Sequence, residues 1–117
     1  MSAETDFRAA LAAHAPLTTL VGQRIRLDAA EQSDAMPYVV FTSEHDLQHG
    51  MDGTLLGDIC TMTVQCWAKT AVEAAAVADA CTAAAAAAQA PVTARATGFD
   101  PELDADAVVL TIPWLTG

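Results

Sequence analysis

Regular alternation of apolar and polar residues over positions 58–69 is the clearest pattern in the chain. In DICTMTVQCWAK the cysteines, the methionine and the valine share one parity, while two threonines and a glutamine share the other. A strand turns successive side chains to opposite faces of its sheet. The pattern therefore predicts a strand with one face buried in a core.

An alanine-rich segment follows at residues 71–90 and predicts a long helix. Thr70 precedes it and a glutamate stands three residues later, an arrangement in which each side chain can bond the other residue's backbone N–H. Val77 and Cys81, four residues apart, mark its apolar stripe, and Pro91 is expected to end it. Because alanine buries little area, at about 25 cal/mol per Å², the helix should dock weakly for its length.

Weaker patterns predict the remaining elements. Thr5 is positioned to cap a short amphipathic helix that ends before Pro16, and the segment PLTTLVG has the form of a helical turn closed by Gly22. Three glycines predict a long flexible connection over residues 48–57, rather than a tight hairpin turn. The expected strands cover residues 24–27, 37–45, 58–69, 92–96 and 107–114.

These elements predict an α+β fold in a single domain, residues 1–117. Its antiparallel β-sheet packs against the long alanine-rich helix and the short N-terminal helix. Aromatic residues make up only 5% of the sequence, so the expected core is modest. We therefore expect contacts with other subunits to supply part of the stability.

Charge narrows the possible partners. Fifteen acidic and five basic residues give a formal net charge of −10, which disfavours direct binding to nucleic acid or to an anionic membrane. No window has the roughly 18 uninterrupted apolar residues of a membrane helix, and the first residues do not resemble a signal peptide. With an odd count of three cysteines, these features predict free thiols and a cytoplasmic product.

Candidate chemistry is sparse. His45 and His49 have the spacing of a metal-binding pair, but that spacing brings two ligands together on a helix, and here it falls on a strand end and a glycine-rich loop. We interpret this segment as a solvated polar loop. No serine stands in a nucleophile elbow, and the glycines form no phosphate-binding pattern. No catalytic residue, cofactor or metal site is therefore predicted, and the protein is not expected to be an enzyme.

The order of motifs points to a known family. The motifs are ALAAHAPLTTLVGQRI, then MPYVVF, then a loop with MDG, then VQCWAKTAVEAAAVADA. As a set they resemble the phage tail completion proteins, the tail terminators of siphophages, prophages and gene transfer agents. The resemblance spans nearly the whole chain. It departs at the end, where the family usually has a longer strand with charged and aromatic residues and this chain has AVVLTIPWLTG, with Pro113 inside.

The resemblance implies a structural virion protein at the head-proximal end of the tail, assembled in the host cytoplasm. Such a subunit forms a homo-oligomeric, hexameric ring that caps the major tail tube protein and presents a surface to a neck or stopper protein. DNA passes through the ring without specific binding. Within the flexible connection, Met51, Leu55 and Leu56 are candidate interface residues, although they could equally fold back onto their own sheet.

Two alternatives remain at this stage. Another neck component, such as a stopper or head–tail connector, would share the size and the ring. A small cytosolic ligand-binding domain is more distant, since it would need a pocket with convergent polar groups.

Overall fold

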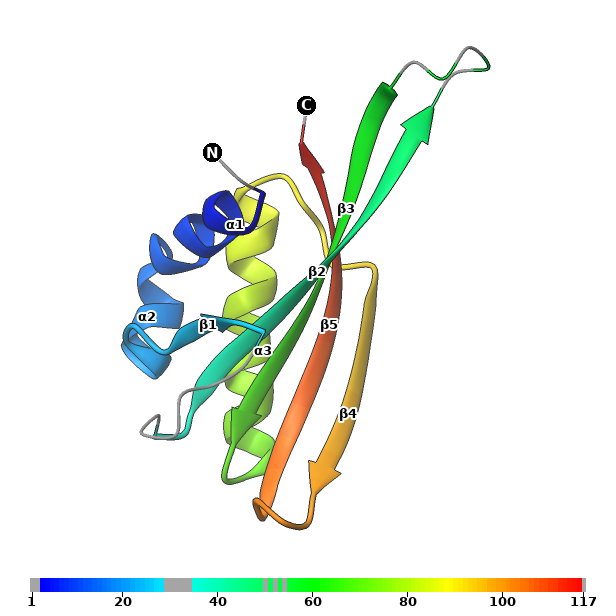
Figure 1. Cartoon of the computed structure of the whole chain (residues 1–117). Coiled ribbons are helices and arrows are strands. Elements are labelled where there is room, and N and C mark those ends of the chain that lie inside the picture. The colour runs from blue at the N-terminus through cyan, green and yellow to red at the C-terminus, as the bar shows by residue number, and fades with distance from the viewer. Residues whose placement is uncertain (1–2, 29–34, 50, 52, 54, 117) are drawn as a thin grey trace.

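A computed structural model describes residues 3–28, 35–49, 51, 53 and 55–116, with the side chains of all of these except 47–49, 55–59, 115 and 116. Helices and strands form a single α+β unit, which confirms the predicted fold class (Figure 1). In chain order the elements are α1 (Ala3–Ala12), α2 (Ala15–Val21), β1 (Ile25–Leu27), β2 (Tyr38–His49), β3 (Leu55–Ala68), α3 (Ala71–Ala87), β4 (Ala94–Asp100) and β5 (Ala105–Thr116).

The strands of the described residues form a five-stranded sheet in the order β1-β2-β3-β5-β4. Neighbours from β2 to β4 pair antiparallel, as predicted. The edge strand β1 is the exception, because it pairs parallel to β2. Two helices stand before β1, since PLTTLVG forms a short helix, α2, rather than a single turn. Gly22 ends it with a positive φ of 61°, and its N–H donates to the Thr18 carbonyl at 2.8 Å.

The helices gather on one face of the sheet (Figure 1). The apolar parity of β3 faces them, and Cys60, Met62, Val64 and Cys66 are fully buried, as predicted from the alternation. The predicted stripe of α3 is also buried at Val77 and Cys81. Alanines fill the rest of the α3 contact with the core, which is the small-residue docking expected from the sequence. The buried alanines of α3 are Ala74, Ala78, Ala80, Ala84 and Ala85.

The start of α3 agrees with the sequence, but its end does not. Thr70 Oγ1 accepts a hydrogen bond from the Glu73 N–H at 3.2 Å, which confirms the cap. The helix ends at Ala87, before the predicted limit at residue 90. Gln89 adopts a positive φ of 62°, and the N–H of Ala90 bonds the Ala85 carbonyl at 2.9 Å. This Schellman-type closure provides N–H donors for the last carbonyls of the helix, so the helix ends before it reaches Pro91.

Thr5 does not cap α1, because the helix already begins at Ala3. Glu4 and Asp6 lie in its first turn, where negative charge stabilises the helix dipole. Phe7 and Leu11 are buried on one side of α1, as the amphipathic pattern predicted.

Pro113 lies within β5 without disturbing its pairing. The Thr111 carbonyl accepts a hydrogen bond from the Thr93 N–H at 2.9 Å, so the backbone polar groups of Thr111 face the β4 side. Two residues later, Pro113 faces the same side, beyond Ala94, the first residue of β4. A proline on an unpaired edge removes no ladder hydrogen bond. The last strand therefore pairs with β3 from Asp106 to Thr116, on both sides of Pro113.

The predicted long connection between β2 and β3 is wrong in extent. Both strands continue through most of it, with Gln48 opposite Gly57 and, after a register shift, His49 opposite Leu55. Backbone pairing between β2 and β3 keeps this segment extended, although its glycines, considered without that pairing, predict irregular backbone. The result is a projecting arm, which we define as residues 43–49, 51, 53, 55–62 and 112–116 (Figure 1). It contributes to a molecule of 51 × 29 × 25 Å.

Candidate assembly interface

The tip of the arm carries the candidate interface residues. Met51 is fully exposed at the end of the hairpin. Leu55 and Leu56 are the first residues of β3, so their backbone belongs to a strand and not to a loop, while their side chains lie outside the described part of the structure. Contact of these residues with a neighbouring subunit stays a prediction. The structure does show that they are carried away from the helices (Figure 1).

A polar cluster ties the base of the arm to α1. Ser43 Oγ donates to Glu4 Oε1 at 2.7 Å, and His45 Nε2 lies 2.7 Å from the same oxygen. The hydrogen bonds from His45 and Ser43 lower the pKa of Glu4 to about 2. Cys60 Sγ lies 3.8 Å from His45 Nε2 on the β3 side. Residues that are far apart in sequence thus fix the direction in which the arm leaves the helices.

His45 is therefore a strand residue and not part of a solvated loop. His49, which the sequence does not predict to form a metal-binding pair with His45 despite the spacing, is the last residue of β2. Among the residues that the structure describes, no group of three or more histidine, cysteine, aspartate or glutamate side chains is arranged to hold a metal ion. The structure instead uses the imidazole as a hydrogen-bonding partner of Glu4.

Aromatic side chains pack beneath the same junction. Phe7 on α1 stacks edge-to-face with Phe41 on β2 and with Trp114 on β5, each at a centroid distance of 5.2 Å. Such edge-to-face pairs contribute beyond the area they bury. The helix is thereby held to both the body of the sheet and the arm.

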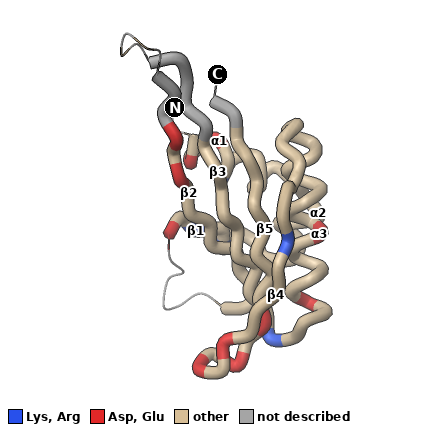
Figure 2. The backbone as a smooth tube through the Cα atoms, turned by 90° about the vertical axis from the view of Figure 1, so that its right-hand side faces the viewer, with Lys and Arg blue, Asp and Glu red and all other residues tan. Residues whose placement is uncertain are grey.

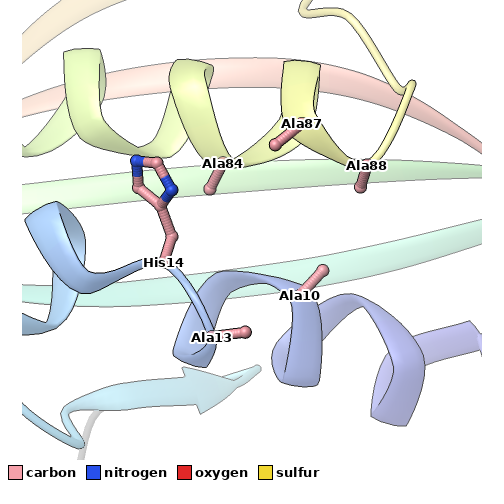
Figure 3. A pocket seen from close by; sticks show the side chains of 6 residues that line it. All are labelled: Ala10, Ala13, His14, Ala84, Ala87 and Ala88. Atoms are coloured by element: carbon pink, nitrogen blue, oxygen red, sulfur yellow. The ribbon is translucent and has the colours of Figure 1, made fainter.

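A shallow groove separates α1 from α3, with a volume of about 240 Å³ (Figure 3). Small methyl side chains make up most of its walls, and the half-buried His14 imidazole points across it toward α3. Its lining residues are Ala10, Ala13, His14, Ala84, Ala87 and Ala88. Walls of methyl groups offer little for the specific recognition of a polar small molecule.

The thiols lie in the core, where the structure has all three free. Cys66 on β3 and Cys81 on α3 approach to 3.8 Å between their sulfur atoms. The hydrogen bond between these thiols, together with burial, raises the pKa of Cys81. Sequence spacing missed this proximity, because it arises only when α3 docks onto the sheet.

Acidic residues are distributed unevenly along the backbone (Figure 2). They gather at the turn between β4 and β5 and along β2, while Lys and Arg are few. Arg95 on β4 is committed to an exposed ion pair with Asp79 on α3, at 2.8 Å. Among the described helices, none has the length and apolar composition needed to cross a bilayer.

Comparison with known proteins decides the family. A family model described as tail completion protein gp17 matches residues 5–116. The chain belongs to this family. It is therefore a structural protein of a phage-type tail and a component of the virion. No curated protein sequence matched the chain.

A solved structure shares the fold of this chain. It is a chain from the virion of a native gene transfer agent (GTA) particle, and it superposes with a TM-score of 0.74 at 19% sequence identity. The match covers 95% of this chain and 92% of the other. At this level of identity the likeness establishes the fold, and nearly the whole chain takes part in it.

Proposed function

We propose that this tail completion protein is the tail terminator. Its subunits form a ring, hexameric by analogy with its family, which covers the last layer of the tail tube and joins it to the neck of the filled capsid. The observation that carries the proposal is the family match over residues 5–116, since it includes nearly every described element. The projecting arm supports it, because a ring subunit needs surfaces that extend beyond its own core.

The mechanism is geometric rather than chemical. Tube subunits present the same end surface after every layer, so heterologous stacking continues until a different protein covers that surface. A ring that binds the tube on one side and the neck on the other ends growth and supplies the next attachment point. Its free energy comes from shape-complementary interfaces.

The acidic character of the chain suits a passage for DNA. Six copies would carry a formal charge of 6 × −10 = −60. Acidic residues along the channel would repel the phosphate backbone and keep the DNA from adhering to the ring. A ring with a basic channel wall would contradict this part of the proposal.

Imaging of particles made without the protein tests the function. We expect filled capsids separated from tail tubes, with tubes that are abnormally long because nothing arrests their polymerisation. Purified protein added back should restore joining. Tails of normal length attached to heads would exclude the terminator role. Tails of uniform length that are unattached, together with leaking capsids, would instead identify the stopper.

A further inference from the structure

Among the described residues, no strand pairs with the outer edge of β2 along the arm. β1 pairs with β2 only from Val39 to Phe41. The Val39 N–H donates to the Arg24 carbonyl, and the Phe41 carbonyl accepts from the Asp28 N–H, so these two β2 residues face β1. Alternation along a strand turns the backbone of Ser43 to the same edge, past the end of β1. No strand within the described residues covers that position.

The opposite side of the sheet offers β4 as its edge. The Thr111 carbonyl faces β4, so residues of β4 whose backbone N–H and C=O groups point toward β5 alternate with residues whose backbone groups point outward, namely Arg95, Thr97 and Phe99. No proline interrupts β4. The adjoining edge of β5 is different, because Pro113 deprives it of an N–H there, a common device against pairing.

The two open edges also carry matching side-chain features. Phe99 is 57% exposed, an unusual state for a phenylalanine, and it has the same parity as Arg95, whose guanidinium reaches α3. Phe99 therefore lies on the helix-covered side of the sheet. On that same side, beside the open edge of β2, lies a groove of about 370 Å³. Its lining residues are Glu4, Thr5, Arg8, Leu27, Asp28, Phe41 and Ser43.

We propose that β4 of one subunit adds to the open edge of β2 in the next subunit and places Phe99 in this groove. The inference rests on the proposed ring. Because β2, β3, β5 and β4 alternate in direction, a sheet continued from one copy to the next joins β4 to β2 antiparallel, with the helix-covered faces aligned. Leu27 lines the groove and is 45% exposed, and addition of the neighbouring subunit's strand would cover its apolar surface. Two different edges of identical subunits meet, so the contact is heterologous and can close a ring.

The register of the sheet fixes a step between neighbouring subunits. Phe99 pairs with Asp106 of β5. Ser43 pairs with Met62, which pairs with Ile112 of β5. These two β5 positions are 112 − 106 = 6 residues apart, about 20 Å along the strands at ~3.3 Å per residue. A ring built in this way has its strands inclined to the ring axis, as strands are in a closed barrel.

Proline substitutions at outward-facing positions test the joint. Ser43→Pro and Thr97→Pro remove an N–H that points away from the subunit's own ladder, and they obstruct strand addition. Ser43→Ala and Thr97→Ala are the matched controls, since they lose the same hydroxyl but retain the N–H. Sedimentation velocity over a concentration series should show the midpoint of assembly of each proline variant shifted by about tenfold or more relative to that of its alanine control, which accounts for loss of the hydroxyl, including the Ser43 hydrogen bond to Glu4. Circular dichroism of each variant establishes that the subunit is folded.

A cross-link provides a readout that does not depend on proline. Ser43→Cys and Phe99→Cys, made in separate proteins, mixed and oxidised with a low-molecular-weight disulfide, should give a covalent dimer on a non-reducing gel, and neither protein alone should. Two results would overturn the joint and leave the terminator function standing. One is rings that form normally from folded proline variants, and the other is rings of the mixed cysteine variants in which no cross-link forms. Edge variants that stay assembled but lose binding to purified tube protein would also overturn it, because the edge would then belong to the tube. Wild-type protein that neither assembles nor arrests tubes would refute the proposed function itself.

Discussion

The same three strands behave differently in the two halves of the sheet. In the body, β2, β3 and β5 are flanked by β1 and β4 and covered by the helices, and their inward side chains are almost wholly buried. At the base of the arm Ser43 and His45 of β2 lie within hydrogen-bond distance of Glu4 on α1, while Glu44 and Asp46 are exposed. The difference indicates a division of labour, in which burial in the body stabilises the subunit and the arm presents surface for assembly.

The largest expected effect comes from replacing a buried phenylalanine in the core of the body, and an exposed phenylalanine at the β4 edge of the sheet serves as the comparison. Phe7→Ala removes a fully buried ring that contacts both Phe41 and Trp114, and it should lower the free energy of unfolding by about 3 to 5 kcal/mol. Phe99→Ala removes an exposed ring and should change it by less than about 0.5 kcal/mol. Urea denaturation of the isolated subunits measures both. Equal losses would mean that β4 contributes to the core as α1 does.

A smaller effect is expected at the start of α3. Thr70→Ala removes the oxygen that accepts the Glu73 N–H and should cost about 1 kcal/mol of stability. Thr82→Ala, in the same helix, removes a hydroxyl that bonds the Ala78 carbonyl, which the helix does not need, and should be nearly neutral. Thermal melts should resolve the pair, since 1 kcal/mol shifts the Tm by about 4 °C in a chain of this size. A neutral Thr70→Ala would show that docking alone holds the helix start.

The elements that the sequence predicted well are specified by nearby residues. Thr70 and Glu73 mark the start of α3, and the alternation of β3 marks its buried face, so neither needs knowledge of a distant partner. The end of α3 escaped prediction because a run of alanines carries no stop signal before Gln89 turns to a positive φ. The arm escaped because long-range pairing between β2 and β3 overrides what its glycines favour locally.

The candidate site was predictable only in part. Met51 could be proposed from an exposed apolar residue among glycines, and the structure leaves it exposed. The cluster of Glu4 with Ser43 and His45 joins segments about forty residues apart, and no sequence spacing encodes that contact. The function came from the order of motifs along the chain, and the family match supports it.

A pH-dependent effect is expected at this cluster, which links the two regions. The pKa of Glu4 is lowered from 4.5 to about 2, so its hydrogen bonds contribute fully above about pH 4.5, and the contribution is lost as pH falls through about 2. Glu4→Gln should therefore lower the Tm by about 2 °C at pH 7, with the difference from wild type disappearing by pH 2. Asp6→Asn removes a charge from the same helical turn and is the control. A difference that persists unchanged at pH 2 would mean that the carboxylate charge is not what holds the arm.

The smallest effect on stability is expected at the tip, where the functional effect should be specific. Met51 is fully exposed, so Met51→Ser should leave the free energy of unfolding within about 0.5 kcal/mol of wild type. If the arm makes contacts in the assembled tail, the same variant should weaken head–tail joining when it is added to particles made without the protein. Val72→Ser is the matched control, because Val72 is also exposed but lies in the first turn of α3, at the end of the molecule away from the hairpin (Figure 1). Equal loss of joining from both variants would indicate a general dependence on exposed apolar surface, and no loss from Met51→Ser would remove the tip from the interface.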